Sequence, residues 1–459
     1  MSKKVHPYDS NAVIEYIENY RYEYKDSKKE AFHCLRMPVL IKSDKTLWEL
    51  ANVYVQSLLI EKSRKQSTLE SSATNLLDFL RFLEHSNLDM LHLPEEKYER
   101  VTYRYRDFLL QSVRQNLIKP STANARINKV LRFYDFCISN QLFDKKYLRN
   151  KPYTEISKSI MIPTDFGLDR KIEVTSSDLA IRSTKRHVAS DVIVDGGQLH
   201  PLNEQEQDLI KEYLMNTAST EFKFMCLVAL YTGARIQTVC TLRVRNLLEL
   251  KKNKINEFDD TYSLKIGHGT PIDSKNGTRM VLKIPKWLLD DLIKYSKSNN
   301  WKKRAKASYY GNTDQNYLFL TKYGTPYYTS LLEIEDRRKS NSLHGFKRAV
   351  GLSVRMHLNQ MIKKLNTIDN CVSPFSFHDF RATFGLNIVK AMTRSQVNGD
   401  QALIYLKDRM GHKSMRTTLS YLEYSSFLSS VVNTNTKFSE ELNNYNPNPN
   451  LESKGNKSE

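Results

Sequence analysis

Apolar residues recur at three- and four-residue spacing in four stretches between Leu47 and Leu148, a pattern typical of helices that bury one face. The stretches are TLWELANVYVQSLLIEK, STLESSATNLLDFLRFLEHSN, EEKYERVTYRYRDFLLQSVRQN and PSTANARINKVLRFYDFCISNQ. The pattern therefore predicts a compact helical domain over residues 44–150. Three basic side chains of its fourth helix are expected on the surface: Arg126, Lys129 and Arg132.

The helical pattern resumes after Pro201 with NEQEQDLIKEYLM and EFKFMCLVALYTG, and it continues to about Val432. It is interrupted by TYSLKIGHGTPIDSKNGTRMVLKIP, in which two strand-like runs flank the turn SKNG. Such runs around a short polar turn predict an antiparallel hairpin. We therefore expect a mixed α/β domain over residues 200–433, in a chain that is mainly α with a small antiparallel β-sheet.

The remaining segments differ in composition from the two domains. Residues 151–199 are charged, Ser-rich and Gly-containing, which is typical of an interdomain linker, with a short strand at DVIV. Residues 1–43 form an N-terminal extension without a motif. Residues 434–459 are polar and poor in apolar side chains, so we expect a disordered tail.

The charge balance favours a polyanionic partner. The chain has 70 Lys+Arg against 51 Asp+Glu, a formal net charge of +19. Such an excess is typical of nucleic-acid binding, because each phosphate contact releases counterions, although a basic surface without a specific partner remains an alternative. No apolar run resembles a membrane span and the N-terminus lacks a signal-peptide core, so a cytoplasmic protein without membrane contact is expected.

The five cysteines are far apart and lie among apolar residues, without a spacing suited to a metal site. Buried free thiols and no metal are therefore expected. The cysteines are Cys34, Cys137, Cys226, Cys240 and Cys371.

Two segments place arginine near the start of a helix. In LYTGARIQTVCTL, Gly233 ends one helix and Arg235 begins the next, where free backbone N–H groups and a guanidinium suit a phosphate. A helix-end salt bridge is the ordinary alternative. In SPFSFHDFRATFGLNIV, Ser376 and Asp379 form a predicted N-cap pair.

On the same predicted helix, His378 and Arg381 are three residues apart, so both are expected on a non-core face. Together they suit holding a phosphate and moving a proton, although either alone is also an ordinary surface residue. Lys275, at the tip of the predicted hairpin, is simply solvated unless the turn reaches a reacting phosphodiester.

The segment QALIYLKDRMGHKSMRTTLSYLEY predicts a helix that ends at Gly411 and a second helix capped by Ser414. The core side of the second helix is expected to run through Met415, Leu419 and Leu422. Tyr421 lies next to this stripe, and His412 lies in the turn nine residues before it.

The order Arg…Lys…His-x-x-Arg…His…Tyr resembles the tyrosine recombinases, also called the phage integrase family. The matching pieces are YTGARI, SKNGTR, HDFRATF and MGHKSMRTTLSY. STANARINKVLRFYDF is similar to the end of that family's helical, SAM-like core-binding domain. The resemblance covers about residues 45–430 and implies that the helical domain, including Arg126, Lys129 and Arg132, binds DNA.

The resemblance also implies a role for each of the six polar residues. Arg235 and Arg381 would clamp a phosphate, and Lys275 would protonate the leaving 5′ oxygen. His378 would be the acid/base histidine, His412 would hydrogen-bond the phosphate, and Tyr421 would be the nucleophile.

By the same resemblance, the expected activity is that of a site-specific DNA recombinase or integrase. It would cleave and rejoin double-stranded DNA through a 3′-phosphotyrosine intermediate and a Holliday junction, without a metal or cofactor. A synaptic homo-tetramer is implied, with SSFLSSVVNTNTKF as a docking segment, accessory DNA-bending or directionality proteins as further partners, and a nucleoid location in a bacterial-type cell. A type IB topoisomerase-like enzyme and a non-catalytic DNA-binding protein are the alternatives.

The chain departs from the family pattern at one position and offers rival residues at two others. Thr238 stands three residues after Arg235, where many relatives carry an acidic residue. Lys265 and Lys283 lie near Lys275 and are rival candidates for the hairpin lysine. Tyr424 is the rival nucleophile, but the nine-residue interval from the Gly-His turn and the preceding TT favour Tyr421.

Overall fold

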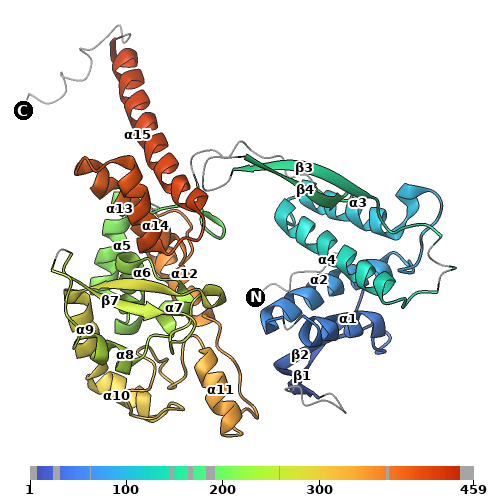
Figure 1. Cartoon of the computed structure of the whole chain (residues 1–459), viewed down its shortest axis with the longest axis horizontal. Coiled ribbons are helices and arrows are strands. Elements are labelled where there is room, and N and C mark those ends of the chain that lie inside the picture. The colour runs from blue at the N-terminus through green and yellow to red at the C-terminus, as the bar shows by residue number, and fades with distance from the viewer. Residues whose placement is uncertain are drawn as a thin grey trace, which may run out of the picture. The chain divides into compact units, whose positions relative to one another are not determined.

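The computed structural model describes residues 8–23, 32–62, 64–144, 146, 149–163, 169–181, 192–257, 259–367 and 372–444. The chain divides into two compact units. The first unit holds Met1–Arg186 with Leu343–Gly345, and the second holds His187–Ser342 and Phe346–Glu459. Figure 1 labels the helices and strands of both units.

Four helices form the centre of the first unit, as the apolar periodicity predicts. They are α1 (Glu49–Ile60), α2 (Gln66–His85), α3 (Val101–Arg114) and α4 (Pro120–Ser139), with a short 3-10 turn, η1 (Lys97–Glu99), before α3. Their apolar faces enclose an aromatic core in which Phe79 contacts Tyr105 and Tyr134, and Phe133 contacts Trp48. These aromatic residues supply much of the buried apolar area that stabilises the unit.

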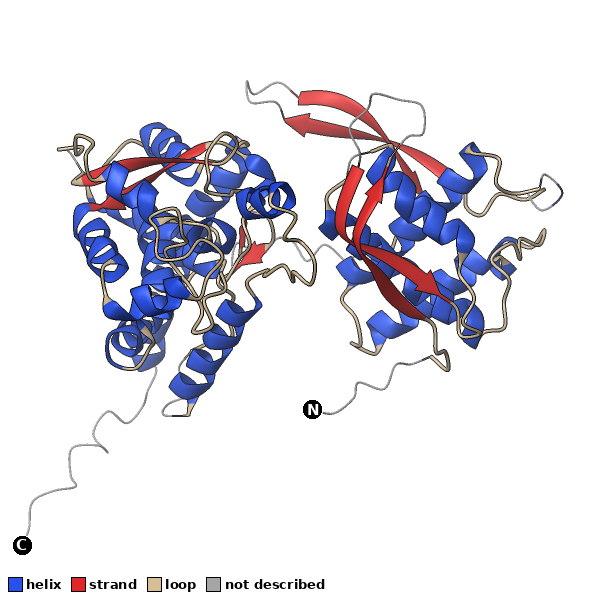
Figure 2. Ribbon diagram, turned by 90° about the horizontal axis from the view of Figure 1, so that it is seen from below, coloured by secondary structure: helices blue, strands red, loops and turns tan. Residues whose placement is uncertain are grey.

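Two antiparallel hairpins complete the first unit, and both lie where no regular structure was expected. In the N-terminal extension, β1 (Val13–Tyr22) pairs with β2 (Phe32–Ile41), and β2 packs on α1 and α2. In the expected linker, β3 (Glu155–Pro163) pairs with β4 (Asp169–Ser177). Figure 2 shows these strands in red against the blue helices. Leu179 and Ile181, which follow β4, are buried in the core of this unit, so the first unit extends well past residue 150.

The three basic residues of α4 have different surroundings. Arg126 forms an ion pair of 2.9 Å with Asp78, whose carboxylate also accepts hydrogen bonds from Tyr8 and Tyr105. Lys129 donates to Ser72 and is half-buried, and burial lowers its pKa. Arg132 is exposed. The expected exposure therefore holds for Arg132, whereas the side chain of Arg126 is 23% exposed and is held by its ion pair with the partly buried Asp78.

The second unit is built around α6 (Thr220–Thr232), a helix whose residues are buried on nearly all sides. It packs on α13 (Asp379–Arg394), α5 (Glu204–Asn216) and the strand β8 (Met280–Pro285). A helix that is apolar all round belongs in the centre of a core, with other helices covering it.

The predicted hairpin of this unit is confirmed. β7 (Thr261–Ile266) pairs with β8, with Thr261 opposite Pro285 and Ile266 opposite Met280. The loop between them holds Lys275 in a short 3-10 turn, η3 (Lys275–Gly277). A second strand pair consists of β5 (Ile193–Val194) and β6 (Gln198–Leu199), where the DVIV strand was expected.

The other helices of the second unit surround this framework. They are α7 (Ile236–Cys240), α8 (Val244–Leu250), α9 (Lys286–Ser296), α10 (Asn299–Lys306), α11 (Leu331–Lys339), α12 (Leu352–Asn366), α14 (Gly399–Met410) and α15 (Met415–Asn444). Because α15 runs to Asn444, the first part of the expected tail is helical. Residues 445–459 lie outside the described residues.

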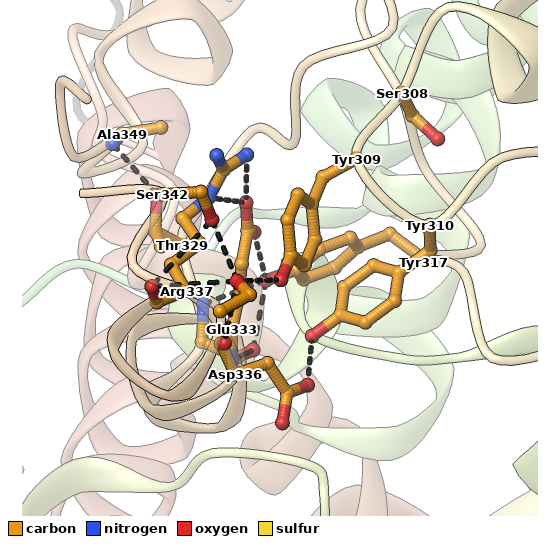
Figure 3. Close-up of polar contacts among 12 residues, drawn as sticks. Ser308, Tyr309, Tyr310, Tyr317, Thr329, Glu333, Asp336, Arg337, Ser342 and Ala349 are labelled. Carbon is orange, nitrogen blue, oxygen red and sulfur yellow. Dashed lines mark hydrogen bonds and ion pairs between the residues drawn. The ribbon is translucent and has the colours of Figure 1, made fainter. Parts of the chain in front are cut away.

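A polar network surrounds α11, which lies in the sequence between the β7–β8 hairpin and α13. Figure 3 shows Glu333, Asp336 and Arg337 of α11 directed toward three tyrosines. Tyr317 donates to Glu333 at 2.7 Å, and Tyr310 donates to Asp336 at 2.6 Å. Since Glu333 is fully buried, its ion pair with Arg337 offsets the cost of desolvating the carboxylate.

Four of the cysteines are buried free thiols, as expected: Cys34, Cys137, Cys226 and Cys240. Cys371 lies outside the described residues. Among the helices of the described ranges, none combines the length and the apolar character that crossing a membrane requires.

Candidate active site

The turn between β5 and β6 places Asp195 at the point where most of the candidate residues meet. Its Oδ2 atom accepts from Arg381 Nε at 2.7 Å, His412 Nε2 at 3.2 Å and the Tyr421 hydroxyl at 3.3 Å. Its Oδ1 atom accepts from Arg235 Nη2 at 3.0 Å. We call the group around this carboxylate the oxyanion pocket; its members are Arg235, His378, Arg381, His412 and Tyr421.

Arg235 is positioned by the end of α6. Gly233 adopts a left-handed conformation with φ of 68° and ends that helix, after which Arg235 becomes the N-cap of α7. An ideal Cβ at Gly233 would lie 3.0 Å from Phe384 Cε1, so both the backbone conformation and the packing favour glycine. This is the arrangement that the TGAR segment predicts.

Arg381 lies in the first turn of α13 and is 1% exposed, so the expected non-core face is a wrong prediction for this residue. Besides Asp195, its guanidinium donates to the carbonyl oxygens of Gly233 at 2.8 Å and Met410 at 2.5 Å. These carbonyls end α6 and α14, where the helix dipoles place negative charge. Arg381 is buried because three acceptors surround its charge.

His378 is the N-cap of α13, and its Nε2 lies 2.9 Å from the main-chain oxygen of Asp195. The predicted contact between Ser376 and Asp379 is present, since both the amide and the hydroxyl of Ser376 donate to the Asp379 carboxylate, but Ser376 is not the N-cap of this helix. Asp379 also accepts from the amide of His200 at 2.7 Å. The start of α13 is thereby fixed to the segment that follows β6.

His412 follows Gly411, which ends α14 with φ of 61° as predicted. Because a carboxylate only accepts hydrogen bonds, His412 Nε2 carries the proton that it shares with Asp195. His412 Nδ1 therefore accepts from the hydroxyl of Thr418 at 3.1 Å. The threonine sets the tautomer of the histidine and joins it to α15.

Tyr421 is fully buried on α15. Of the predicted core stripe of this helix, Leu422 packs against the core and the prediction for Leu419 is wrong. Leu419 is 40% exposed, whereas Thr418, Tyr421 and Tyr424 face the core. The aromatic ring of Tyr421 lies against Gly385 of α13. A prediction from apolar residues alone gives the wrong buried face for this helix at Leu419, because the buried face carries polar groups of the site.

Lys275 reaches the same turn from the β7–β8 loop. An ideal Cβ built on Gly196 would lie 2.7 Å from Lys275 Nζ, so the ammonium group sits against the residue next to Asp195. Of the two rival lysines, Lys283 forms an ion pair with Asp259 at 3.0 Å, and Lys265 is exposed on β7. The structure therefore brings Lys275 to the pocket.

Asp273 connects the Lys275 loop with the helix that follows Arg235. Thr238 donates to the main-chain oxygen of Asp273 at 2.9 Å, and Gln237 donates to its carboxylate at 3.2 Å. That carboxylate also accepts from the amide of Leu331 at the start of α11. Thr238, which departs from the family pattern, thus holds the loop through its hydroxyl.

The charges of the pocket determine the protonation of its groups. Burial on its own raises the pKa of Asp195, but the hydrogen bond from His412 and the charges of Arg381 and Arg235 hold the pKa far below its usual range. Burial lowers the pKa of both histidines and, with the charge of Asp195, raises the pKa of Tyr421 well above that of a free phenol. At neutral pH the pocket therefore holds a carboxylate, neutral histidines and a protonated tyrosine.

Asp195 is the residue that the sequence reading missed. It lies within the expected linker, 186 residues before Arg381 and 226 before Tyr421. The local signal is an acidic residue followed by two glycines directly after a short apolar run. Among the described residues, no group of three His, Cys, Asp or Glu side chains is arranged to hold a metal ion.

The second unit directs guanidinium, imidazole and phenol groups at one oxyanion. These are the groups that an enzyme of phosphoryl transfer requires. Residues 201–426 match the model of the Phage integrase family. This region is therefore a phage integrase domain, and the domain indicates a tyrosine site-specific recombinase.

The chain is also similar to solved integrase structures. The Tn1549 transposon integrase in complex with circular intermediate DNA is 14% identical with a TM-score of 0.45, covering 81% of this chain and 94% of that chain. A lambda integrase dimer bound to a COC′ core site is 12% identical with a TM-score of 0.45, covering 82% and 95%. A lambda integrase tetramer bound to a Holliday junction is 11% identical with a TM-score of 0.43, covering 80% and 77%. No curated protein sequence matches the chain.

Proposed function

We propose that this recombinase cleaves double-stranded DNA at specific sites by attack of the Tyr421 hydroxyl on a phosphodiester. The observation that carries the proposal is the convergence of Arg235, Arg381, His412 and Tyr421 on the carboxylate of Asp195. A DNA phosphate offers the same donors a larger oxyanion with more acceptor positions. The pocket is therefore suited to a scissile phosphate.

The chemical step assigns a role to each group. Arg235 and Arg381 hold the non-bridging oxygens and stabilise the charge that builds up in the transition state, and His412 Nε2 donates to one of these oxygens. Tyr421 attacks phosphorus and forms a 3′-phosphotyrosine bond, while its proton passes to His378 as the base. Lys275 protonates the leaving 5′ oxygen. The reverse steps join the free 5′ hydroxyl to the phosphotyrosine of a partner strand.

Basic residues on both units suit binding to the DNA backbone. Beside His412, a cavity of about 780 Å³ is lined by Arg279, Lys407 and Lys413, on the β7–β8 loop and around the end of α14. On the first unit, a cavity of about 540 Å³ is lined by Lys62, Arg64, Lys129 and Arg132. The linings also include Glu61, Asp135 and Asp408, but basic residues outnumber them, and the net charge of +19 is in keeping with phosphate contacts at these surfaces.

We further propose that strand exchange takes place in a homo-tetramer through a Holliday junction. The lambda integrase, to which the chain is similar, has been solved as a tetramer bound to such a junction. In this chain, the part of α15 beyond Tyr424 includes Phe427, which is 36% exposed. This part of the helix is the candidate for docking on a neighbouring subunit.

The test is covalent capture on a nicked suicide duplex, in which the fragment that carries the 5′ hydroxyl diffuses away after cleavage. The wild-type protein is expected to form an adduct that migrates slowly on a denaturing gel. The Tyr421→Phe variant is expected to form none, and Tyr424→Phe is the matched control. An adduct that persists in Tyr421→Phe and disappears in Tyr424→Phe would refute the assignment.

A second assay separates recombination from relaxation of supercoiled DNA. Two labelled duplexes that carry the target site are expected to exchange strands with each other. A type IB topoisomerase would instead relax a plasmid without requiring a particular site and would produce no exchange between duplexes.

A further inference from the structure

The turn of Asp195, Gly196 and Gly197 fills the position that the proposed function gives to the scissile phosphate. We propose that this turn is an internal pseudosubstrate, which must leave the oxyanion pocket before a DNA phosphate can enter. This inference rests on the proposed function, because it takes the pocket to be the site of DNA cleavage. We call residues 195–197 the Asp195 turn.

The turn and a phosphate compete for the same donor atoms. Arg381 Nε, Arg235 Nη2 and the Tyr421 hydroxyl all donate to the carboxylate, and the main-chain oxygen of Asp195 occupies His378 Nε2. A phosphodiester brought into the pocket would have to share these donors with an anion that is 4% exposed. Two anions in contact within a buried pocket repel strongly, so occupancy is exclusive.

The shape of the turn suits the pocket. Gly196 has φ of +72°, and a side chain there would meet Lys275 Nζ. The amide of Asp195 donates to the oxygen of Gly197 at 3.2 Å, which keeps the turn tight. Glycine at position 196 therefore lets the main chain approach the catalytic lysine while Asp195 points at the two arginines.

The turn is anchored at both sides by buried apolar residues and by hydrogen bonds to α13. Ile193 and Leu199, which are opposite each other in the β5–β6 pair, are buried in the apolar cluster that also contains Tyr421. After β6, the amide of His200 donates to Asp379, and the amide of Leu202 donates to Thr383 at 2.9 Å. Because Gly196 and Gly197 have no side chains, the side-chain hydrogen bonds of the turn are those of Asp195 with the pocket.

This arrangement predicts a specific kinetic signature. If only a fraction of the molecules has an open pocket, the apparent affinity for DNA is reduced by that fraction. Asp195→Asn removes the charge and keeps the size of the side chain. Asp195→Asn is therefore expected to lower the DNA concentration for half-maximal cleavage about tenfold, because the turn loses a charged hydrogen bond that keeps the pocket closed. The cleavage rate at saturating DNA is expected to stay at the wild-type value.

The experiment measures adduct formation on the nicked suicide duplex as a function of DNA concentration. Wild type, Asp195→Asn and the control Asp208→Asn are compared as full-length chains. Asp208 is an exposed residue of α5 that is ion-paired with Lys211, so its variant is expected to follow the wild type. Thermal unfolding of each variant checks that the chain is folded at the assay temperature.

The outcomes separate this inference from the proposed function. Loss of the maximal rate in Asp195→Asn would show that Asp195 supports the reaction and would overturn the pseudosubstrate. An unchanged DNA dependence would overturn it as well. In both cases an adduct that depends on Tyr421 leaves the proposed function standing, whereas wild-type cleavage that survives Tyr421→Phe refutes the proposed function itself.

Because Arg381 is buried, loss of its anionic partner lowers stability, so a second variant covers the case in which Asp195→Asn does not fold. Gly196→Ala keeps the carboxylate but places a methyl group against Lys275 Nζ and strains the turn at its positive φ. It is expected to shift the DNA dependence in the same direction. If Gly196→Ala leaves the DNA dependence of the wild type, the inference is wrong.

Discussion

Replacing Gly385 with alanine tests whether the position of the Tyr421 ring determines the cleavage rate. Gly385 lies on α13, one turn after Arg381. An ideal Cβ at this position would lie 2.8 Å from Tyr421 Cδ1, closer still to Cε1, and 3.2 Å from Met410 Cε. Since non-bonded carbons settle about 3.5 Å apart, the ring has to retreat by about 1 Å.

The structure predicts a small loss of stability and a large loss of cleavage rate for Gly385→Ala. Alanine in a helix interior is favoured over glycine by about 1 kcal/mol, and overpacking a core costs about 1–3 kcal/mol. The net loss of unfolding free energy is therefore at most about 2 kcal/mol, which leaves the chain folded. A nucleophile misplaced by about 1 Å loses on the order of 100-fold in rate.

The assay is single-turnover adduct formation on the nicked suicide duplex at saturating DNA, together with thermal unfolding. Gly399→Ala is the matched control, because Gly399 lies at the start of α14 with no atom within 4 Å of an added Cβ. The reasoning is refuted if Gly385→Ala is folded and cleaves at the wild-type rate.

Three further predictions follow from the same contacts. Lys275→Ala is expected to slow cleavage by about 10²- to 10⁴-fold. Its cleavage rate is expected to recover on a duplex with sulfur at the bridging 5′ position, since a thiolate leaves without a proton. Lys283→Ala, which breaks the pair with Asp259, is the control, and failure of the rescue contradicts the role of Lys275. Thr238→Val removes the hydroxyl that holds Asp273 and, through it, the Lys275 loop. The variant should therefore slow cleavage of ordinary DNA more than cleavage of the sulfur-substituted duplex. An equal effect on both would contradict a role of Thr238 in positioning Lys275. Thermal stability should fall as the pH drops from 7.5 to 5.5, because burial keeps the pKa of His378 and His412 below the unfolded value of about 6.5, so the unfolded chain binds protons that the folded chain does not. His412→Asn should flatten this dependence, and an unchanged slope in the variant would assign it to other groups.

The helices that apolar periodicity predicts are present because each buries a stripe of ordinary hydrophobic residues, as α2 and α4 do. The same rule fails on α15, where Thr418 and Tyr421 take the buried face that Leu419 was expected to occupy. It also fails for Arg381, whose burial depends on carbonyls of two other helices, and no local pattern encodes these. Functional sites are where local rules and the fold disagree.

The motif order identified the polar residues of the pocket, and the structure brings them together around one carboxylate. Asp195 could not be found in this way, because its partners are up to 226 residues away and its own segment looks like a linker. The β1–β2 and β3–β4 hairpins escaped notice for a related reason. The β1–β2 strands mix charged and apolar residues without a clear alternation, and packing of β2 on α1 and α2 stabilises that hairpin. The β3–β4 strands pair with each other and are rich in charged and Ser residues, which is why their segment resembles a linker.

The enclosure of the Tyr421 hydroxyl has a consequence for chemical labelling. Reagents that modify tyrosine, such as sulfonyl fluorides, react with the phenolate, and this phenol is both buried and held protonated by its surroundings. In the absence of DNA the side chain should therefore resist such reagents, while exposed tyrosines such as Tyr98 and Tyr323 react. Labelling of Tyr421, read by peptide mass spectrometry, would then report opening of the pocket without any need for a known target sequence.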